Sequence, residues 1–520
     1  MPGLVSSVHS GENTANFLSH PVDDSFTTCG SVTTSVAGDG SLESLLSVPT
    51  GDMHDLICVG FGPASLAIGI ALQDHLEQVH ASPKSRPKIA FIERQLNFAW
   101  HSGMQLPGAK MQISFVKDLA TLRNPRSRFT FLNYLWTQGR LVHFTNLGTF
   151  LPSRLEYQDY LRWCAEPFEH LVHYGQEVRE VAPAQQNPSS QKVESFVITS
   201  RDVNNGQIST YRAKHVVLAT GGQQSIPQAF AQATSLWPQV IHSSQYMTSL
   251  PSLLRFPQTL NRIAVVGGGQ SGAEIFCDLQ ARFPNATTSL IIKSGALKPT
   301  DDSPFVNEIF DPSQTTNVYR RDRALREATI ASDKTTNYGV VRLELIERIY
   351  RDLYTQSLFA SSESQPQHCI LRHRTITGVE SLPSGAIKLR CNNATALYEN
   401  CDDDAIEELH FDLVVLATGY TRDAHTSMLR PTQHLLPEHL SLGSSDRWEV
   451  AENYRVQYDD EKVDHNVAGV WLQGCNENTH GLSDTLLSVL ANRGGQIVDS
   501  IFGHDEEIAN GISATKSIKT

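Results

Sequence analysis

Two glycine-rich segments of this chain have the residue types and the spacing that could bind the diphosphate of a dinucleotide. In the first, the short apolar run Leu56–Val59 is followed directly by Gly60 and Gly62. Gly60 permits a tight turn, Gly62 lets the backbone approach a diphosphate, and the amides of a helix beginning behind Pro63 point at that anion. Ser65 stands where the usual fingerprint has its third glycine. Taken alone, such a turn is weak evidence for a nucleotide site.

The second segment repeats the design and strengthens the interpretation. Arg262–Val266 forms another apolar run, and Gly267, Gly269 and Gly272 all follow in register before an apolar helical face. Two dinucleotide folds in one chain predict two dinucleotides, and a flavin paired with a nicotinamide is the obvious combination.

The strands that follow each glycine turn end in side chains suited to an adenosine ribose. Lys88–Ile92 is followed by Glu93, whose carboxylate would accept hydrogen bonds from the ribose hydroxyls of the first cofactor. Ser289–Ile292 is followed by Lys293, a cation that could pair with a 2′-phosphate, so NADPH is favoured over NADH. The alternatives are a charged strand terminus for the first residue and a surface lysine for the second.

Two further apolar strands end in the same Ala-Thr-Gly sequence, within 214–222 and within 411–420. Such strand ends are typical of crossovers between two nucleotide domains. The second glycine turn lies between them in sequence, which predicts an α/β fold with one Rossmann-like domain inserted into another. Residues 380–410, with the acidic run Asp402–Asp404, are interpreted as a solvated excursion.

Composition excludes several classes of function. The 520 residues carry 42 Lys and Arg against 55 Asp and Glu, a formal charge of −13, and no basic stripe marks a nucleic-acid site. The eight cysteines are scattered without a CxxC pair, which argues against a disulfide framework, a metal site such as zinc, or the dithiol of a disulfide reductase. No apolar run is long enough to span a bilayer, and the first fifty residues lack the cations of a targeting sequence, so a cytoplasmic location is expected.

Polar loops that abut apolar residues are candidate binding segments. The segment 98–136 has the mixture expected of a cofactor-lining loop, although a charged side chain such as Lys117 is more often simply solvated. The segment 475–490 is a polar loop running into an apolar helix, with Ser483 or Asp484 expected as its cap. The N-terminus of that helix would stabilise an anionic reduced flavin if it pointed at the ring.

With these residues in view, the chain closely resembles the fungal L-ornithine N-monooxygenases of siderophore biosynthesis, within the flavin-dependent N-hydroxylating monooxygenases. The similarity covers roughly residues 53–505. A Baeyer-Villiger type signature survives only as His242 and Tyr246. The most specific stretches are Phe98–Met104, Lys110–Pro125, Asp301–Phe310, Ala417–Tyr420 and Asn476–Leu490.

The resemblance implies a role for individual residues. FAD would be held by Gly60, Gly62, the run from Glu93 through Phe98 and Trp100 to His101, Gln112, His480, Gly481 and Leu482. NADPH would be held at the turn of Gly267 and Gly269 by Gln270, Ser271 and Lys293, where the family usually has arginine at the last position. L-Ornithine would be placed by Lys117, Asn307, Asn337 and Ser483, with the two asparagines orienting the reacting amine.

In the implied reaction NADPH reduces FAD, O2 adds to the reduced ring as a hydroperoxide, and the side-chain amine of L-ornithine is hydroxylated to N5-hydroxyornithine. Lysine N6-hydroxylation, one methylene away and worth only ~1–3 kcal/mol in a pocket, stays open, as does a non-catalytic flavin-binding regulator. Family members are commonly homotetramers. The implied organisation is a disordered tail at 1–52, an FAD domain at 53–223 and 411–505, an NADPH domain at 262–301 and 348–410, a small substrate domain at 224–261 and 302–347, and a C-terminal tail at 506–520.

Overall fold

The computed structural model describes residues 45–49, 51–79, 86–253, 260–359, 366–394, 406–438 and 448–503. Most of the expected tails at 1–52 and 506–520, and the acidic run Asp402–Asp404, lie outside these ranges. Within the expected tail, Leu46 forms an isolated parallel bridge with Lys88, so the described residues 45–49 are not disordered. Within the described ranges, no helix has both the length and the apolar character needed to cross a bilayer.

The first sheet has seven strands, and the first glycine turn lies at the carboxyl end of its strand β1. Parallel pairing joins β3 to β2, β2 to β1, β1 to β6, and β6 to β17, while β4 and β5 continue from β6 as an antiparallel meander. Its strands are β1 (Met53–Val59), β2 (Ile89–Ile92), β3 (Val172–His173), β4 (Gln176–Pro183), β5 (Phe196–Asp202), β6 (Ile208–Leu218) and β17 (Gly469–Leu472).

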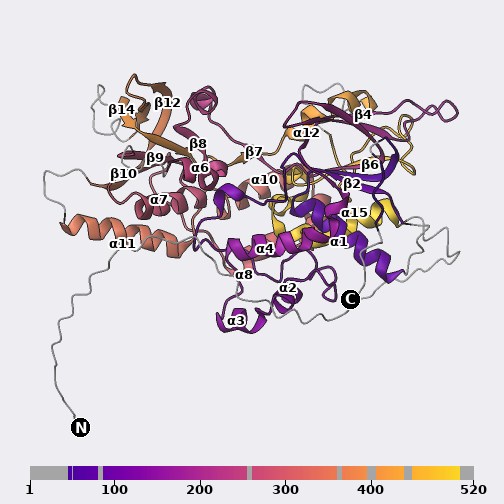
Figure 1. Cartoon of the computed structure of the whole chain (residues 1–520), viewed down its shortest axis with the longest axis horizontal. Helices are drawn as coiled ribbons and strands as arrows, with labels where there is room; N and C mark the ends of the chain where they lie inside the picture. Colours follow the sequence, from indigo (N-terminus) through magenta and orange to yellow (C-terminus); the bar gives the residue numbers. More distant parts are fainter. Residues whose placement is uncertain are drawn as a thin grey trace, which may run out of the picture. The chain divides into compact units, whose positions relative to one another are not determined.

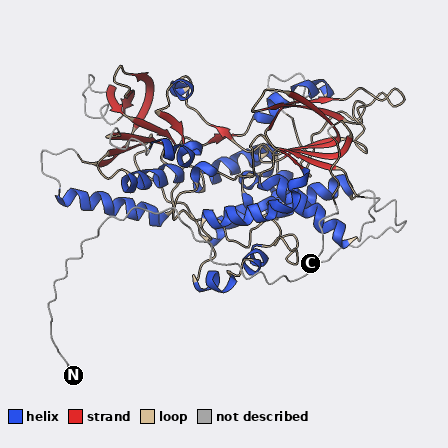
Figure 2. Cartoon of the chain, in the orientation of Figure 1, coloured by secondary structure: helices blue, strands red, loops and turns tan. Residues whose placement is uncertain are grey.

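Helix α1 (Pro63–Gln78) follows the first turn and is buried over most of its length. It crosses α15 (Leu490–Phe502) so closely that a Cβ added to Gly494 would lie 2.8 Å from the carbonyl oxygen of Ala67. The strands gather in two groups flanked by helices (Figure 2). Further helices between β2 and β3 are α2 (Phe131–Thr137), α3 (Leu141–Asn146) and α4 (Arg154–Ala165).

The second sheet is parallel throughout, in the order β11-β10-β9-β15-β8. Figure 1 labels β8, β9 and β10 of this sheet. Apolar side chains of α6, α7 and α11 share a core with its strands. The strands are β8 (Val240–His242), β9 (Arg262–Val266), β10 (Thr287–Ile291), β11 (His368–Leu371) and β15 (Leu413–Leu416). The helices are α6 (Tyr246–Leu253), α7 (Gln270–Arg282) and α11 (Leu343–Phe359).

The second sheet corrects two of the expected boundaries. Strand β8 lies within 224–261, which was expected to bind substrate, yet it pairs with β15. Strand β15 lies within 411–505, which was expected to belong with the FAD-binding part, yet it pairs with β9. Both strands therefore belong to the nicotinamide-type fold, whose core extends to the residues on either side of the expected limits.

The expectation of a solvated excursion at 380–410 is wrong for its described residues. They form most of an antiparallel sheet of β12 (Arg374–Ser381), β13 (Ile387–Asn393) and β14 (Ile406–Phe411). Ile387, Leu389 and Cys391 of β13 are fully buried, in one apolar cluster with Val414 and Leu416 of β15. This small sheet is thus an integral layer of the second domain.

The insertion of one domain into the other is confirmed by the two crossovers. The chain leaves β6, passes through β7 (Gln223–Gln224), and enters the second sheet at β8. It returns from β15 through β16 (Tyr420–Thr421), which pairs antiparallel with β7. The two connections therefore lie side by side, each directly after one of the Ala-Thr-Gly sequences.

A helical excursion at 304–336 packs on the segment that follows β17. The guanidinium Nε of Arg326 donates to the carbonyl oxygen of Asn478 at 2.9 Å, and Lys334 Nζ lies 2.8 Å from Glu477 Oε1. These contacts hold the helical excursion, which ends next to Asn337, against the polar loop within 475–490. The elements are α8 (Pro304–Asn307), α9 (Gln314–Arg320), α10 (Arg323–Asp333) and, after β17, α14 (Glu477–His480).

Candidate functional site

The first glycine turn has the backbone geometry of a diphosphate cradle. Gly60 has φ +93°, and a Cβ added there would lie 2.6 Å from the carbonyl oxygen of Ala219. Gly62 precedes α1 with φ −87°, and a Cβ added there would meet nothing within 4 Å. Gly60 is therefore required by the fold itself, whereas Gly62 borders open space at the N-terminus of a 16-residue helix. An anion fits that space because the first helical amides have no intrahelical acceptors.

Glu93 lies beside this turn, as the sequence predicted. Its carboxylate is 7% exposed and accepts backbone N–H groups from Phe61 at 2.7 Å and from Gln95 at 2.8 Å, one on each oxygen. These bonds fix the carboxylate against the turn. Each oxygen keeps a further lone pair, so the carboxylate can still accept a ribose hydroxyl.

The loop from Phe98 to His101 is held by both domains. The ring of Phe98 is buried and meets Phe61 edge-on at 5.7 Å, while the backbone N–H of Trp100 donates to Gln158 Oε1 at 2.9 Å. His101 has a left-handed backbone, φ 48°, and its ring lies 6.0 Å from that of Tyr420 at the return crossover. The loop therefore bridges the first glycine turn and the crossover.

His101 is kept neutral by its surroundings. Loss of solvation, followed by the nearby cations Arg154 and Arg422, lowers the pKa of its imidazole to about 4. A neutral ring at physiological pH can donate or accept a hydrogen bond without adding charge beside a cofactor.

The second glycine turn repeats the geometry of the first. Gly267 has φ +131°, and an added Cβ would overlap the carbonyl of Ala417, as one at Gly60 would approach Ala219. Both Ala-Thr-Gly sequences are thus explained, because each places a small residue against the first glycine of one turn. Gly269 faces the loop that carries Asn337, since an added Cβ would lie 3.6 Å from the Cα of Gly339.

The first residues of α7 belong to a polar network that joins the two domains. Gln270 Oε1 accepts the backbone N–H of Arg342 at 2.9 Å, and its amide nitrogen donates to Glu274 at 2.8 Å. Glu274 in turn forms a bidentate pair with Arg154 of α4, at 2.7 and 2.9 Å. Ser271, the second residue of α7, is half-buried. The network fixes the side chain of Gln270 directly after the second glycine turn.

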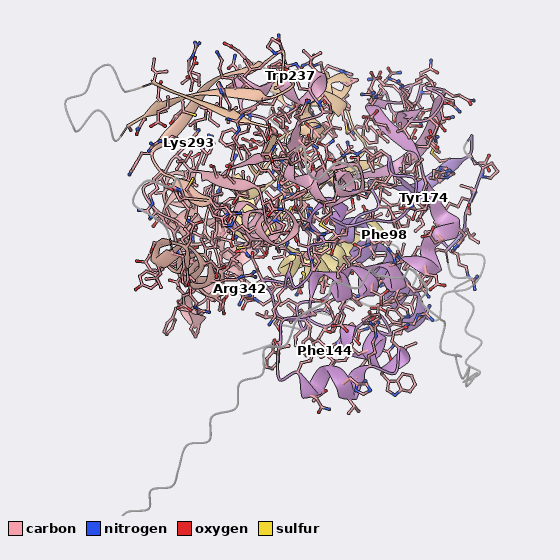
Figure 3. The ribbon with its side chains drawn as sticks, turned by 60° about the vertical axis from the view of Figure 1, so that its left-hand side comes forward. Phe98, Phe144, Tyr174, Trp237, Lys293 and Arg342 are labelled. Atoms are coloured by element: carbon pink, nitrogen blue, oxygen red, sulfur yellow. The ribbon has the colours of Figure 1, made fainter. Side chains whose placement is uncertain are left out.

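Lys293 is exposed two residues after the end of β10, and Figure 3 labels it together with Arg342. Because β10 neighbours β9, the lysine stands at the same edge of the sheet as the second glycine turn. That is the position from which a cation could meet a 2′-phosphate.

The loop at His480 is built around a buried aromatic contact. The imidazole of His480 stacks on Tyr454 at 4.1 Å, with Nε2 3.1 Å from the carbonyl oxygen of Glu452 and Nδ1 2.9 Å from the hydroxyl of Thr479. Burial lowers the pKa of this imidazole. Gly481 has φ +85°, and Leu482 is buried. The ring of His480 thus holds the turn, and Val318 of α9 packs against Gly481, where an added Cβ would lie 3.2 Å from its side chain.

The expected helix cap at Ser483 or Asp484 is wrong. Helix α15 begins only at Leu490, and the residues before it form two short 3-10 turns, at 482–485 and 487–489. The carboxylate of Asp484 instead pairs with the buried Arg493 at 2.7 Å and accepts the backbone N–H of Asn476 at 2.7 Å. This ion pair locks the loop that carries Ser483 onto α15.

Asn307, Asn337 and Ser483 lie on segments that contact one another. The hydroxyl of Ser488 donates to the carbonyl oxygen of Phe310 at 3.3 Å, which joins the end of α8 to the loop of Ser483. The hydroxyl of Tyr338, next to Asn337, donates to Glu477 Oε2 at 2.6 Å. The same hydroxyl lies 3.3 Å from Thr485 Oγ1. The segments of Asn307 and Asn337 thus both contact the loop of Ser483, while the exposed Asn307 itself donates its amide N–H to the carbonyl oxygen of Asp302 at 3.0 Å.

Lys117 and Gln112 lie on the loop that precedes α2. Gln112 is exposed, and Lys117 is half-buried and forms no ion pair with a carboxylate of the described ranges. Asp118, the next residue, is buried and accepts backbone N–H groups of Ala120, Thr121 and Phe131, which fixes the loop. Leu122 of this loop lines a cavity of about 270 Å³ together with residues 311–313, just after the segment of Asn307.

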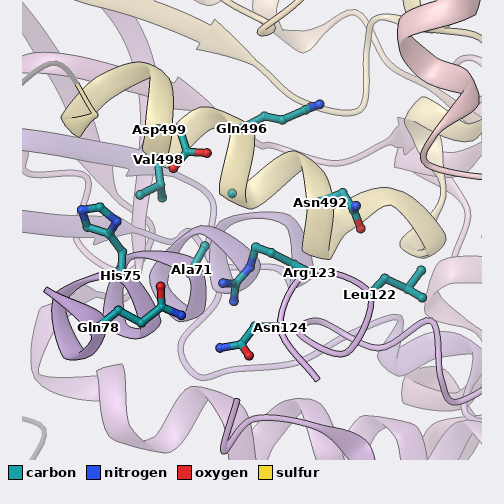
Figure 4. A pocket seen from close by; sticks show the side chains of 11 residues that line it. Ala71, His75, Gln78, Leu122, Arg123, Asn124, Asn492, Gln496, Val498 and Asp499 are labelled. Atoms are coloured by element: carbon teal, nitrogen blue, oxygen red, sulfur yellow. The ribbon is translucent and has the colours of Figure 1, made fainter. Parts of the chain in front are cut away.

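A second hollow adjoins this cavity, because Leu122, Asn492 and Gln496 line both. It has a volume of about 420 Å³ and is lined by α1, by residues 122–124 and by α15, with Arg123 held there by the buried carboxylate of Asp74 (Figure 4). None of the predicted site residues lines it. The candidate site is therefore the edge where the two glycine turns meet the polar loops, and not this hollow.

Sequence reasoning missed residues whose partners are distant in the chain. Gln473, at the end of β17, is 4% exposed, and neither its amide oxygen nor its nitrogen has a partner among the described residues. Orphaned buried polar atoms at this edge fit a cofactor that carries hydroxyl and carbonyl groups. The Arg154–Glu274 pair was also missed, since 120 residues separate its members. In the sequence, Gln473 and a glycine directly follow the apolar run 469–472, and a polar residue at such a strand end was the signal that could have identified Gln473 as a binding residue.

Comparison with known proteins identifies the family of this chain. The family described as L-lysine 6-monooxygenase/L-ornithine 5-monooxygenase matches residues 52–422. The chain belongs to this family. An L-ornithine N(5)-monooxygenase from Emericella nidulans is 52% identical over 463 residues, which are 88% of this chain and 91% of that protein. One from Aspergillus oryzae is 50% identical over 468 residues, 89% of this chain and 91% of that protein.

Solved structures agree with the architecture. The ornithine hydroxylase PvdA from Pseudomonas aeruginosa covers 87% of this chain and 100% of its own, with 36% identity and a TM-score of 0.76. The ornithine N-hydroxylase KtzI from Kutzneria sp. 744, in a structure with reduced FAD, NADP⁺ and L-ornithine, covers 87% of this chain and 100% of its own, with 32% identity and a TM-score of 0.75. The predicted fold of two Rossmann-like domains, one inserted into the other, is confirmed.

Proposed function

We propose that this protein is an L-ornithine N5-monooxygenase that uses FAD, NADPH and O2 to make N5-hydroxyornithine, the first step of hydroxamate siderophore biosynthesis. The observation that carries the proposal is the 52% identity to an L-ornithine N(5)-monooxygenase across about nine-tenths of both chains. Two glycine turns of matching geometry in one chain, at Gly60 and Gly267, support the requirement for two dinucleotides.

We assign FAD to the first turn and NADPH to the second. When bound, FAD supplies the redox chemistry and the activation of oxygen. Glu93 would accept the ribose hydroxyls of FAD, and the backbone at Gly481 would face its ring system. Gln270 and Ser271 would position NADPH at the start of α7, and Lys293 would pair with its 2′-phosphate.

The reacting amine must lose its charge before it can act as a nucleophile. An alkylammonium with a pKa of ~10.4 is about 99.9% protonated at neutral pH, and a carboxylate beside it would hold the proton more firmly. Asn307 and Asn337 can accept a hydrogen bond from the amine without that effect. Lys117, a cation with no described carboxylate partner, would bind the substrate carboxylate at the other end, with Ser483 completing the pocket.

L-Lysine is the second candidate substrate, since the matching family includes both activities. An L-lysine 6-monooxygenase from Pseudomonas syringae shares 26% identity with this chain, against 36% for the ornithine hydroxylase PvdA. Ornithine is therefore favoured. A non-catalytic flavin-binding regulator is disfavoured, because such a protein has no need of the second glycine turn.

We also propose a homotetramer in the cytoplasm. Free cysteines in the described ranges, four of them buried, suit a reducing compartment, and the tetramer follows from the family resemblance. Light scattering of the purified protein tests the assembly, and a mass of one chain or two would refute a tetramer.

The function is tested by incubating the FAD-loaded protein with NADPH and oxygen, offering ornithine or lysine, and measuring hydroxylated amine formed per NADPH consumed. We expect nearly one product per NADPH with ornithine and much less with lysine. NADPH oxidation that yields only peroxide with both amines would mean that the substrate is different. The absence of any oxidation would favour a binding protein.

A further inference from the structure

Arg422 occupies the point where the return crossover meets the carboxyl edge of the first sheet. It directly follows β16, which leaves the second domain. A Cβ added to Gly474, just beyond the end of β17, would lie 3.6 Å from Nη1 of Arg422, closer than any other atom. A side chain from the connection between the domains therefore places its guanidinium over a strand end of the sheet that carries the first glycine turn.

The guanidinium of Arg422 is half-buried and has no acceptor among the described residues. Other half-buried arginines of this region are paired. Arg154 has Glu274 and the carbonyl oxygen of Met104, and Arg342 has Glu344 and the carbonyl oxygen of Met111. A guanidinium carries five N–H donors in a fixed fork, and leaving them without acceptors in a partly dry site is costly. The part of the chain that the structure describes supplies none of these donors with an acceptor.

The charge of Arg422 acts on the predicted binding residues around it. It is one of two cations that lower the pKa of His101. Burial raises the pKa of Tyr338 to about 12, and the charge of Arg422 opposes part of that rise. Arg422 is therefore close enough to act electrostatically on both the loop expected to line FAD and the loop that reaches the second glycine turn. The unpaired guanidinium charge of Arg422 can therefore act on an anion bound at either of the two proposed dinucleotide sites.

We propose that Arg422 is a cofactor-binding residue that receives the diphosphate of a bound dinucleotide where the two domains join. A guanidinium binds diphosphate oxygens in two parallel hydrogen bonds, which a lysine cannot reproduce. The inference rests on the proposed function, since it needs a dinucleotide at this edge. FAD and NADPH both carry a diphosphate, and the experiment separates them.

The test compares Arg422→Met, Arg422→Lys and the wild-type protein. FAD affinity is measured on the apoprotein by the change in flavin fluorescence, and NADP⁺ affinity on the FAD-loaded protein by calorimetry. We expect Arg422→Met to raise the Kd of one dinucleotide by about ten-fold or more, with Arg422→Lys giving a smaller rise because charge alone remains. The dinucleotide whose Kd rises is the one that Arg422 binds. The exposed Arg201 of β5 supplies the control, and Arg201→Met should change neither affinity.

The outcomes separate the inference from the proposed function. If the wild-type protein binds neither dinucleotide, the proposed function fails. If the wild-type protein binds both and Arg422→Met changes neither Kd by more than two-fold, the inference is overturned. A loss of binding for both variants of Arg422 with an unfolded circular dichroism spectrum would show a purely structural residue and would also overturn it.

Discussion

The two glycines of the first turn should respond in opposite ways to the same substitution. A methyl group at Gly60 would lie 2.6 Å from the carbonyl oxygen of Ala219 and would require φ +93°, whereas a methyl group at Gly62 would meet nothing within 4 Å at an ordinary φ of −87°. Gly60→Ala should therefore damage the fold. Gly62→Ala should leave the fold intact and fill the space assigned to a diphosphate.

The magnitudes follow from these contacts. For Gly60→Ala, about 1–2 kcal/mol for the left-handed backbone and ~1–3 kcal/mol for overlap with Ala219 give a loss of roughly 2–5 kcal/mol in the free energy of unfolding. For Gly62→Ala the change in unfolding free energy should stay within about 0.5 kcal/mol. If FAD occupies the space, the same overlap of ~1–3 kcal/mol should weaken its binding about 5-fold to 150-fold.

The assay pairs urea unfolding of the apoproteins with a fluorescence titration of FAD. Weakened FAD binding by a Gly62→Ala protein of wild-type stability would show that the open face of the turn is the cofactor site. Unchanged FAD affinity in that variant would refute the assignment. A Gly60→Ala protein as stable as the wild type would refute the steric argument.

Three further substitutions test separate parts of the account. Lys117→Ala should raise the Kd of ornithine at least about ten-fold while FAD stays bound and NADPH still reduces it, and loss of flavin reduction would contradict the role. Lys293→Ala should raise the KM for NADPH about ten-fold and leave that for NADH unchanged, whereas equal effects would remove the 2′-phosphate contact. Burial, with Arg455 nearby, lowers the pKa of His215 to about 4 from 6.5, so the unfolded state binds more protons between these values. The free energy of unfolding should thus fall by on the order of 2–3 kcal/mol as the pH drops from 6.5 to 4, and His215→Phe should flatten that dependence in urea titrations.

Local spacing was enough to predict the two glycine turns. Gly60 and Gly267 each face a small alanine at the end of an adjacent strand, and both the glycines and the Ala-Thr-Gly sequences are visible in the chain. The position of Glu93 beside the first turn was predicted in the same local way, because it depends only on where one strand ends.

Sheet membership and long-range pairing could not be predicted in this way. The strand Leu413–Leu416 is fully buried and apolar, and such a strand would suit either sheet, so its pairing with β9 was missed. Asp484 has the residue type of a helix cap, but the buried Arg493 nine positions later decides its partner. The sequence shows which side chains are polar, but the fold determines which of them form hydrogen bonds or ion pairs with one another.

The most direct test of the central claim is an anaerobic mixing experiment on the protein loaded with FAD. The account predicts one FAD bound per chain and bleaching of its visible absorbance when NADPH is added, with NADH slower. A protein that takes up no flavin, or a bound flavin that stays oxidised with NADPH present, would contradict the claim that one chain brings two dinucleotides together.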